Sequence, residues 1–217
     1  MQDLKEKVVI IIVIILLILA GILFFQQKQN NNRVSKLYQN INQNQEYIFS
    51  LEEINADIKY KVSIAKKENE MSIDFYTDGE HTSTLMSKGR VYSIMHDEQQ
   101  YYEYDSDELE GDFISSGLKE ASEKEYLSGT ETIEGNNYYY EEYENILSFL
   151  ILLKSDEHSI VKTKFYFKGD EIKFIKNVIY YEDGSEEEEL LSATLDNNVD
   201  SSIFEIPEDY AEMEVTN

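Results

Sequence analysis

The chain contains no cysteine, and basic residues are scarce. The lack of cysteine excludes disulfides, thiolate metal ligands, thiol nucleophiles and a lipid-modified N-terminal cysteine, so burial and hydrogen bonding must stabilise the fold. Only 19 Lys and Arg stand against 44 Asp and Glu, which gives a formal net charge of -25. Because a nucleic-acid interface needs clustered cations to displace counterions, we expect no nucleic-acid partner.

Catalytic motifs are also absent. The sequence contains no G-x-S-x-G nucleophile elbow, no H-E-x-x-H zinc motif and no cysteine pair. No motif surrounds the histidines, which we expect to be ordinary strand or surface residues: His81, His96 and His158. The acidic stretch DSDELEGD at 105–112 departs from an EF-hand loop, since Leu109 occupies its fifth position. We therefore expect no enzyme, no cofactor and no metal site, although the many carboxylates leave calcium open.

One long apolar run lies near the N-terminus. Residues 8–25 carry no charge and are apolar apart from Gly21. As a helix they would be about 27 Å long at ~1.5 Å per residue, close to the ~30 Å hydrocarbon core of a bilayer. The run is longer than the ~7 to 15 residue apolar part of a signal peptide, and no A-x-A cleavage site follows it. It therefore predicts a retained transmembrane signal anchor.

The flanks of this run decide its expected orientation. Lysines and arginines on its two sides are nearly balanced, so charge alone does not orient it. The tail at 1–7 is short and a polar linker at 26–33 leads to a long folded portion, which is typical of an anchor with its bulk outside. We expect a single-pass protein of the cell membrane, mostly extracytoplasmic, with a domain at 34–212 and a disordered tail at 213–217.

The portion beyond the linker shows two kinds of periodicity. Val34, Leu37, Tyr38 and Ile41 have the spacing of one helical face, and predict a helix that leads the domain. After it, alternating apolar and polar residues recur about every ten residues, beginning at 58–65, and predict about ten strands.

Turns and further helices complete the predicted fold. Asp78-Gly79 is a strong turn signal between two of the strands. The stretch FISSGLKEASEKEYL has helical spacing, and ILSFLILL at 146–153 is too short to span a bilayer but apolar enough to dock on a sheet. No βαβ rhythm is present, so the sheet should be antiparallel. The predicted class is α+β: a strongly curved antiparallel sheet, a half-barrel of about ten strands, wrapped around two or three helices and preceded by one N-terminal transmembrane helix.

Three stretches of the sequence resemble a known group. They are GTETIEGNNYYYEEY at 129–143, KFYFKGDEIK at 164–173 and VDSSIFEIPEDY at 199–210. Together with the order of elements over 34–212, they resemble the LolA-like superfamily of lipoprotein carriers, which fold as curved half-barrels around helices. Such carriers are free after signal cleavage, whereas this chain is predicted to keep its anchor and lacks a lipobox cysteine. The resemblance therefore implies a tethered domain that handles or senses a lipid or lipopeptide.

The concave face of such a half-barrel is the predicted ligand site. Burial of apolar area at ~25 cal/mol per Å² would drive binding without directional chemistry. We expect a membrane-tethered, extracytoplasmic binding module for a lipid, lipopeptide or apolar peptide. The residues expected to line the site are Ile58, Tyr60, Val62, Ile73, Phe75, Phe165, Phe167 and Phe174. The residues expected to form a lid or plug over it are Ile146, Phe149, Leu150 and Leu153.

Plain core packing competes for the same apolar side chains. In that case the protein would be a structural or regulatory ectodomain that binds an envelope protein partner and has no ligand cavity. The glutamates at 186–189 fit a contact with a basic partner, or a solvated turn into a strand whose charges discourage edge-to-edge pairing. Both functions stay open at this point.

Overall fold

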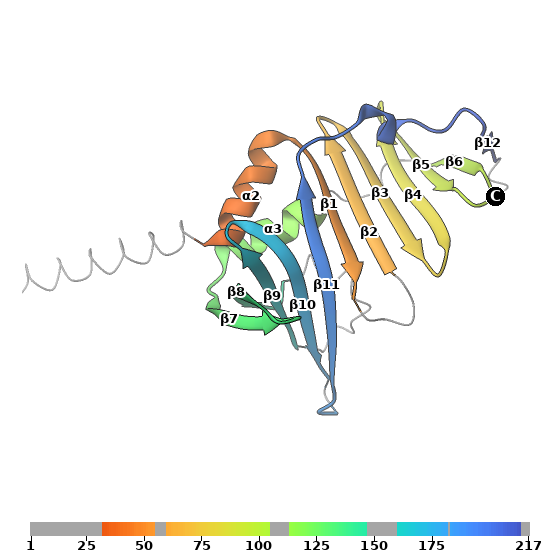
Figure 1. Ribbon diagram of the computed structural model, residues 1–217. Coiled ribbons are helices and arrows are strands. Elements are labelled where there is room, and N and C mark those ends of the chain that lie inside the picture. The colour runs from red at the N-terminus through yellow and green to blue at the C-terminus, as the bar shows by residue number, and fades with distance from the viewer. Residues whose placement is uncertain (1–31, 55–59, 105–112, 147–159, 182, 214–217) are drawn as a thin grey trace, which may run out of the picture.

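The computed structural model describes residues 32–54, 60–104, 113–146, 160–181 and 183–213 (Figure 1). Within these ranges, two α-helices lie against one large sheet: α2 (Arg33–Asn44) and α3 (Phe113–Glu123). The predicted leading helix is confirmed, since α2 buries Val34, Leu37 and Ile41. Asn32 caps its N-terminus by accepting a hydrogen bond from the backbone N–H of Ser35.

The first half of the sheet is an antiparallel meander whose strands pair in sequence order. Its strands are β1 (Glu46–Glu53), β2 (Tyr60–Lys67), β3 (Glu70–Thr77), β4 (Glu80–Ser87), β5 (Arg90–Met95) and β6 (Gln100–Tyr104). At the turn between β3 and β4, Asp78 and Gly79 have φ angles of 52° and 90°. Positive φ at both positions is the type I′ turn, whose twist matches the strands that it joins.

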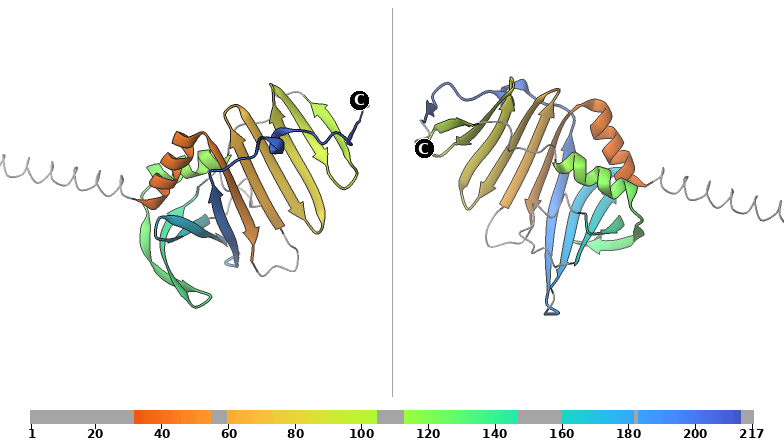
Figure 2. Two further views of the ribbon diagram at one scale, coloured as in Figure 1. Left: turned by 45° about the horizontal axis from the view of Figure 1, so that its top comes forward. Right: turned by 180° about the vertical axis from the view of Figure 1, so that it is seen from behind.

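The second half is also antiparallel and joins the first through the pairing of β1 with β11. Its strands are β7 (Leu127–Ile133), β8 (Asn136–Glu144), β9 (Ile160–Lys168), β10 (Glu171–Tyr180) and β11 (Glu186–Asp196). After β11, the chain crosses the sheet through the 3-10 helix η2 (Ser201–Phe204) to β12 (Ala211–Glu212), the last of the described strands, which pairs with β6 in parallel (Figure 2).

The predicted half-barrel is wrong. The described strands number twelve and form one open, mixed sheet in the order β12-β6-β5-β4-β3-β2-β1-β11-β10-β9-β8-β7. The helices cover part of one face and are not enclosed by the strands (Figure 2). Alternation in a sequence shows that a strand exists and which face each side chain takes, but it does not show which edge the strand joins. The short parallel β12 therefore escaped prediction.

The predicted membrane anchor is corrected as well. The segment at 8–25 lies outside the described residues, as do the tail at 1–7 and the linker up to residue 31. Among the described helices, α2 with 12 residues and α3 with 11 residues are too short and too polar to cross a bilayer. The structure thus does not support the transmembrane helix, the membrane as a partner or the single-pass, extracytoplasmic location that we predicted from this run.

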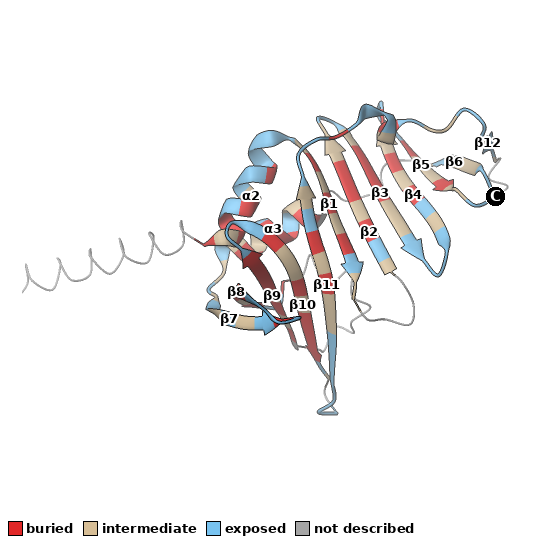
Figure 3. Ribbon diagram, in the orientation of Figure 1, coloured by how far each residue is buried: buried red, intermediate tan, exposed pale blue. Residues whose placement is uncertain are grey.

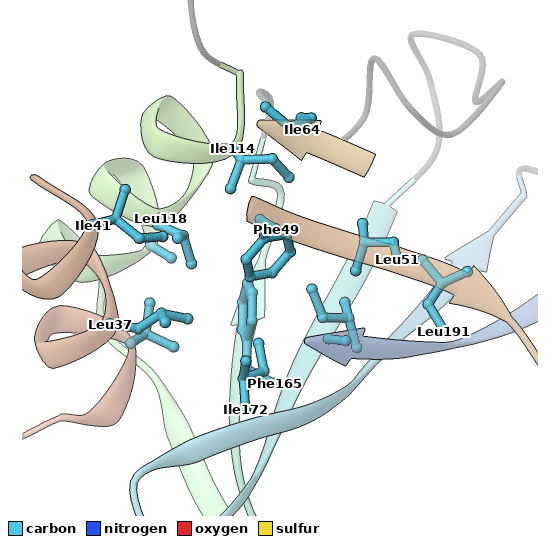
Figure 4. Packing of buried hydrophobic residues seen from close by; sticks show 14 of the residues in the cluster. Leu37, Ile41, Phe49, Leu51, Ile64, Ile114, Leu118, Phe165, Ile172 and Leu191 are labelled. Carbon is cyan, nitrogen blue, oxygen red and sulfur yellow. The ribbon is translucent and has the colours of Figure 1, made fainter. Parts of the chain in front are cut away.

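The main core lies between the helices and one face of the sheet, here called the helix face. In the central strands, such as β1, alternate residues are buried against it, which gives the buried stripes in Figure 3. Phe49, Phe165, Ile114 and Leu118 meet at its centre with at most 1% of their surface exposed (Figure 4). Burying each such side chain contributes about 1.5–3 kcal/mol, so this cluster holds the helices on the sheet. The opposite face, which carries Ser63 and Asp74, is called the outer face.

Candidate functional site

The C-terminal segment, residues 197–213, covers part of the outer face. Val199 and Phe204 are buried there against Ala65, Leu85 and Ile94 of the meander. Asp200 caps η2 by accepting from the backbone N–H of Ser202 at 3.0 Å. The chain therefore crosses the meander from β11 to the edge strand β6 (Figure 2).

A row of polar side chains runs beneath this segment. The register places Ser50 opposite Ser63, Ser63 opposite Asp74, and Asp74 opposite Ser83 on four adjacent strands. Cross-strand partners share a face, so these four side chains all point outward. The hydroxyls of Ser50 and Ser63 are 2.5 Å apart.

The row borders a cavity of about 350 Å³ between the sheet and the C-terminal segment. Its walls combine hydroxyl, carboxylate, ammonium and imidazole groups with a few apolar side chains. They are formed by Ile48, Lys61, Ser63, Ala65, Ser72, Asp74, Tyr76, Ser83, Ile94, His96, Ser202, Ile203, Glu205 and Pro207.

A hydrogen-bonded network links the cavity wall to the C-terminal segment. The Ser83 hydroxyl lies 2.6 Å from Asp74 Oδ1 and 2.6 Å from His96 Nε2. His81 Nε2 lies 3.1 Å from the same Asp74 oxygen, and His96 Nδ1 lies 3.0 Å from the Tyr210 hydroxyl. Tyr210 therefore ties the C-terminal segment to the end of β5.

Three rings of the network stack on one another, and a fourth meets the stack edge-on. The Tyr76 and His81 rings are 4.0 Å apart, and those of His81 and His96 are 3.7 Å apart and within 6° of parallel. The Tyr210 ring meets His96 edge-on at 5.6 Å. The stack fixes both imidazoles beside Asp74.

Burial perturbs two of these groups. Desolvation, followed by the neighbouring His81, lowers the pKa of His96, against the opposing charges of Asp74 and Asp97. Desolvation and the Asp74 carboxylate raise the pKa of Tyr76. At neutral pH the site therefore holds a neutral His96 and a protonated Tyr76.

The order of groups differs from that of a catalytic triad. In a triad the histidine stands between the serine and the aspartate, so that it takes the serine proton while the aspartate orients it. Here Ser83 stands between Asp74 and His96, and the far nitrogen of His96 faces Tyr210. Nothing among the described residues points to catalysis.

The network does hold a set of metal-ligand atoms. One ligand atom each from Asp74, His81 and His96 lie within 4.8 Å of one another. Sequence reasoning treated His81 and His96 as unrelated strand residues. The two-residue turns at Asp78-Gly79 and Lys88-Gly89 could have shown that the two histidines are neighbours. Counting back along the strands from these turns places His81 opposite Tyr76 on one side and opposite His96 on the other.

Most of the apolar residues predicted to bind a ligand belong to the core on the helix face. Those that are buried there are Val62, Ile73, Phe165 and Phe167, with Tyr60 and Phe75 packed beside them. Phe174 lies in a different cluster, where its ring meets that of Tyr138 at 5.1 Å. Ile58 lies outside the described residues.

The predicted lid is described only at its first residue. Ile146 is buried in the main core, with 1% of its surface exposed. The other three positions lie outside the described residues: Phe149, Leu150 and Leu153. The lid stays a prediction.

Comparisons with known proteins add no function. No family model matches the chain, and no curated protein matches it in sequence. A similar solved structure is that of an uncharacterized conserved protein from Thermus thermophilus, with 9% sequence identity and a TM-score of 0.48 over 84% of this chain and 99% of that chain. A likeness this weak carries no argument, and the resemblance to LolA-like proteins stays a prediction.

Proposed function

We propose that this protein is a binding module whose ligand lies in the cavity between the outer face and the C-terminal segment. The observation that carries the proposal is the composition of that cavity. Three serines, Ser63, Ser72 and Ser83, line it next to the Asp74 carboxylate. A few convergent polar groups in a concave site are the usual signature of specific small-molecule binding.

The size of the cavity limits the ligand. Its volume of about 350 Å³ lies near the lower end of the ~300–1,000 Å³ range of ligand pockets. A monosaccharide or another small polyol fits this volume, whereas a two-chain lipid does not.

Charge limits the ligand further. Asp74 and Glu205 contribute two carboxylates to the walls, against the single ammonium of Lys61, and the whole chain has a net charge of -25. A neutral or cationic ligand is therefore favoured over an anion. Ile94, Ile203 and Pro207 supply an apolar wall for the C–H face of a sugar ring.

Carriage of an acyl chain or apolar peptide on the helix face stays a prediction. We prefer the outer cavity because the aromatic side chains predicted for carriage already pack in the core, with Phe165 and Phe167 at most 1% exposed. An apolar ligand would have to displace those contacts.

The test uses the full chain with three probes: glucosamine, glucose and glucuronate. Saturation-transfer NMR should show contact with glucosamine, weaker contact with glucose and none with glucuronate. Ser63→Leu fills the cavity and should abolish the signal, whereas Ser192→Leu on β11, outside the cavity walls, should leave it unchanged. Absence of contact for both glucosamine and glucose, or an undiminished signal in Ser63→Leu, would overturn the proposal. Uptake of a fluorescent fatty acid would favour the helix-face prediction instead.

A further inference from the structure

We infer that Asp74, His81 and His96 form a binding site for a divalent transition metal at the end of the outer cavity. The three side chains come from β3, from β4 and from the residue that follows β5, and one ligand atom of each lies within 4.8 Å of the others. Two imidazoles with one carboxylate are a donor set for Zn²⁺, Co²⁺, Ni²⁺ or Fe²⁺. The inference concerns the metal alone and does not depend on the ligand proposed above.

The candidate ligand atoms lie close to one another around the Asp74 carboxylate. His81 Nε2 lies 3.1 Å from Asp74 Oδ1, and His96 Nε2 lies 2.6 Å from the Ser83 hydroxyl, which itself lies 2.6 Å from that carboxylate oxygen. A cation near Asp74 Oδ1 would replace the protons that these four groups now share. The Ser83 hydroxyl stands beside it as a further oxygen donor.

Tyr210 can hold His96 in the tautomer that a metal requires. The Tyr210 hydroxyl lies 3.0 Å from His96 Nδ1, and it can donate a hydrogen bond to the His96 backbone carbonyl at 3.4 Å. Its oxygen then accepts from Nδ1–H, which leaves the lone pair on Nε2. Metal-binding histidines usually donate their other ring N–H in this way to a fixed acceptor.

Outer contacts also position the other two ligands. Ser72 donates to the second carboxylate oxygen of Asp74 at 3.2 Å, which leaves Oδ1 facing the imidazoles. Asp97 accepts from the backbone N–H of His81 at 2.9 Å and fixes the start of β4. The site therefore rests on two paired strands and on the first turn residue after a third strand.

The ring stack makes a specific demand on metal binding. A metal bonds to an imidazole nitrogen in the plane of the ring, and the planes of His81 and His96 are parallel at a ring separation of 3.7 Å. One ion cannot lie in both planes, so at least one ring must tilt out of the stack when the metal binds. Tilting alters the environment of Tyr76, which stacks on His81 at 4.0 Å.

The experiment titrates the full chain, treated with EDTA and desalted, with Co²⁺ alone and with Zn²⁺ alone. We expect one equivalent to bind by calorimetry, a visible Co²⁺ absorption band of low-symmetry coordination, and a metal-dependent shift in the Tyr76 ring signals by NMR. Mg²⁺, which prefers oxygen ligands, should not compete.

Two variants remove ligands while sparing the fold. His81→Phe keeps a ring between Tyr76 and His96, and Asp74→Asn keeps a hydrogen-bond acceptor for Ser83. Tyr210→Phe removes an outer partner of a ligand and should weaken Zn²⁺ binding roughly 10 to 100-fold. Each of the two ligand variants should weaken Zn²⁺ binding by more than that. His158→Phe is the matched control and should bind as the parent does.

Thermal unfolding without metal reports whether each variant folds. Folded variants that lose the metal-induced rise in melting temperature support the site. The inference is overturned if the parent chain binds neither metal, if both ligand variants bind as the parent does, or if His158→Phe abolishes binding.

Discussion

The buried carboxylate of Glu141 accepts a hydrogen bond from the backbone N–H of Val34 at 3.0 Å. It also accepts from the backbone N–H of Arg33 at 2.7 Å, so one side chain of β8 satisfies two free donors in the first turn of α2. Glu141 itself has no exposed surface. A negative charge at this place complements the helix dipole and joins α2 to the far half of the sheet.

Glu141→Gln should therefore lower the free energy of unfolding by about 1–3 kcal/mol, because charge-assisted hydrogen bonds to a buried carboxylate become neutral ones. Urea denaturation monitored by circular dichroism measures the change. Glu144→Gln, an exposed position on the same strand, is the control and should change stability by less than about 0.5 kcal/mol. Equal effects of the two substitutions would show that the cap contributes nothing.

Glu131 should give the protein part of its acid sensitivity. Burial raises the pKa of Glu131, but hydrogen bonds from Lys164 and Tyr166 outweigh that effect and hold the pKa below its ordinary value of 4.5. A carboxyl with a lowered folded-state pKa stabilises the fold above its ordinary pKa, and this stabilisation is lost as the pH falls through the folded-state value. When the pH is lowered from about 5 to about 3, the urea concentration at the unfolding midpoint should therefore decrease less in Glu131→Gln than in the parent. An identical pH profile in both proteins would refute this role.

Lys164 should give the protein part of its sensitivity to high pH. Burial lowers the pKa of Lys164, but the hydrogen bond to Glu131 and its charge outweigh this and raise the pKa above 10.5. The pair therefore stabilises the fold below pH 10.5 and loses its effect as the pH rises through the folded-state pKa. Lys164→Met should flatten the alkaline part of the stability profile, and Lys168→Met, a change on the same strand, should not.

Phe204 should hold the C-terminal segment on the outer face. It is 3% exposed and packs with Ala65, Leu85 and Ile94. Phe204→Ala should cost about 3–5 kcal/mol if the whole protein unfolds with the segment, and less if the segment detaches alone. Amide hydrogen exchange separates the cases, because the N–H groups of Ala211 and Met213 donate to the carbonyl oxygens of Gln99, just before β6, and of Tyr101 in β6. Faster exchange at these two amides with an unchanged global midpoint would show local detachment, and unchanged exchange would contradict the assignment.

The turn at Gly79 should depend on its backbone conformation. Its φ angle is 90° and no atom lies within 4 Å of a Cβ placed there, so an added methyl group meets strain but no clash. Gly79→Ala should lower the free energy of unfolding by about 1–2 kcal/mol, and Gly79→Asn by less, because asparagine tolerates positive φ better. Thermal denaturation compares the two, and a larger loss for asparagine would contradict the conformational explanation.

Much of the local structure follows from the sequence. The spacing of Val34, Leu37 and Ile41 predicted α2, and the alternation around Val62 and Ile73 placed both side chains on a buried face. These features depend only on the periods of helices and strands, which can be read from a short stretch of sequence.

The candidate site could not be predicted from local periodicity. Asp74, His81 and His96 meet only because three strands pair in a defined register, and the C-terminal segment closes over them from a distant part of the sequence. The register of the hairpins was accessible from their two-residue turns, but the docking of Tyr210 on His96 depends on tertiary packing. Periodicity carries no information about that contact.

The parallel pairing of β12 with β6 has a consequence for self-association of the protein. β12 occupies the bonding edge of β6 through the register of Ala211 with Gln100 and Glu212 with Tyr101, over two residue pairs. An unoccupied strand edge is a template for another chain. Deletion of residues 211–213 would uncover this part of the β6 edge, and we expect it to increase pairing between the β6 edges of neighbouring molecules.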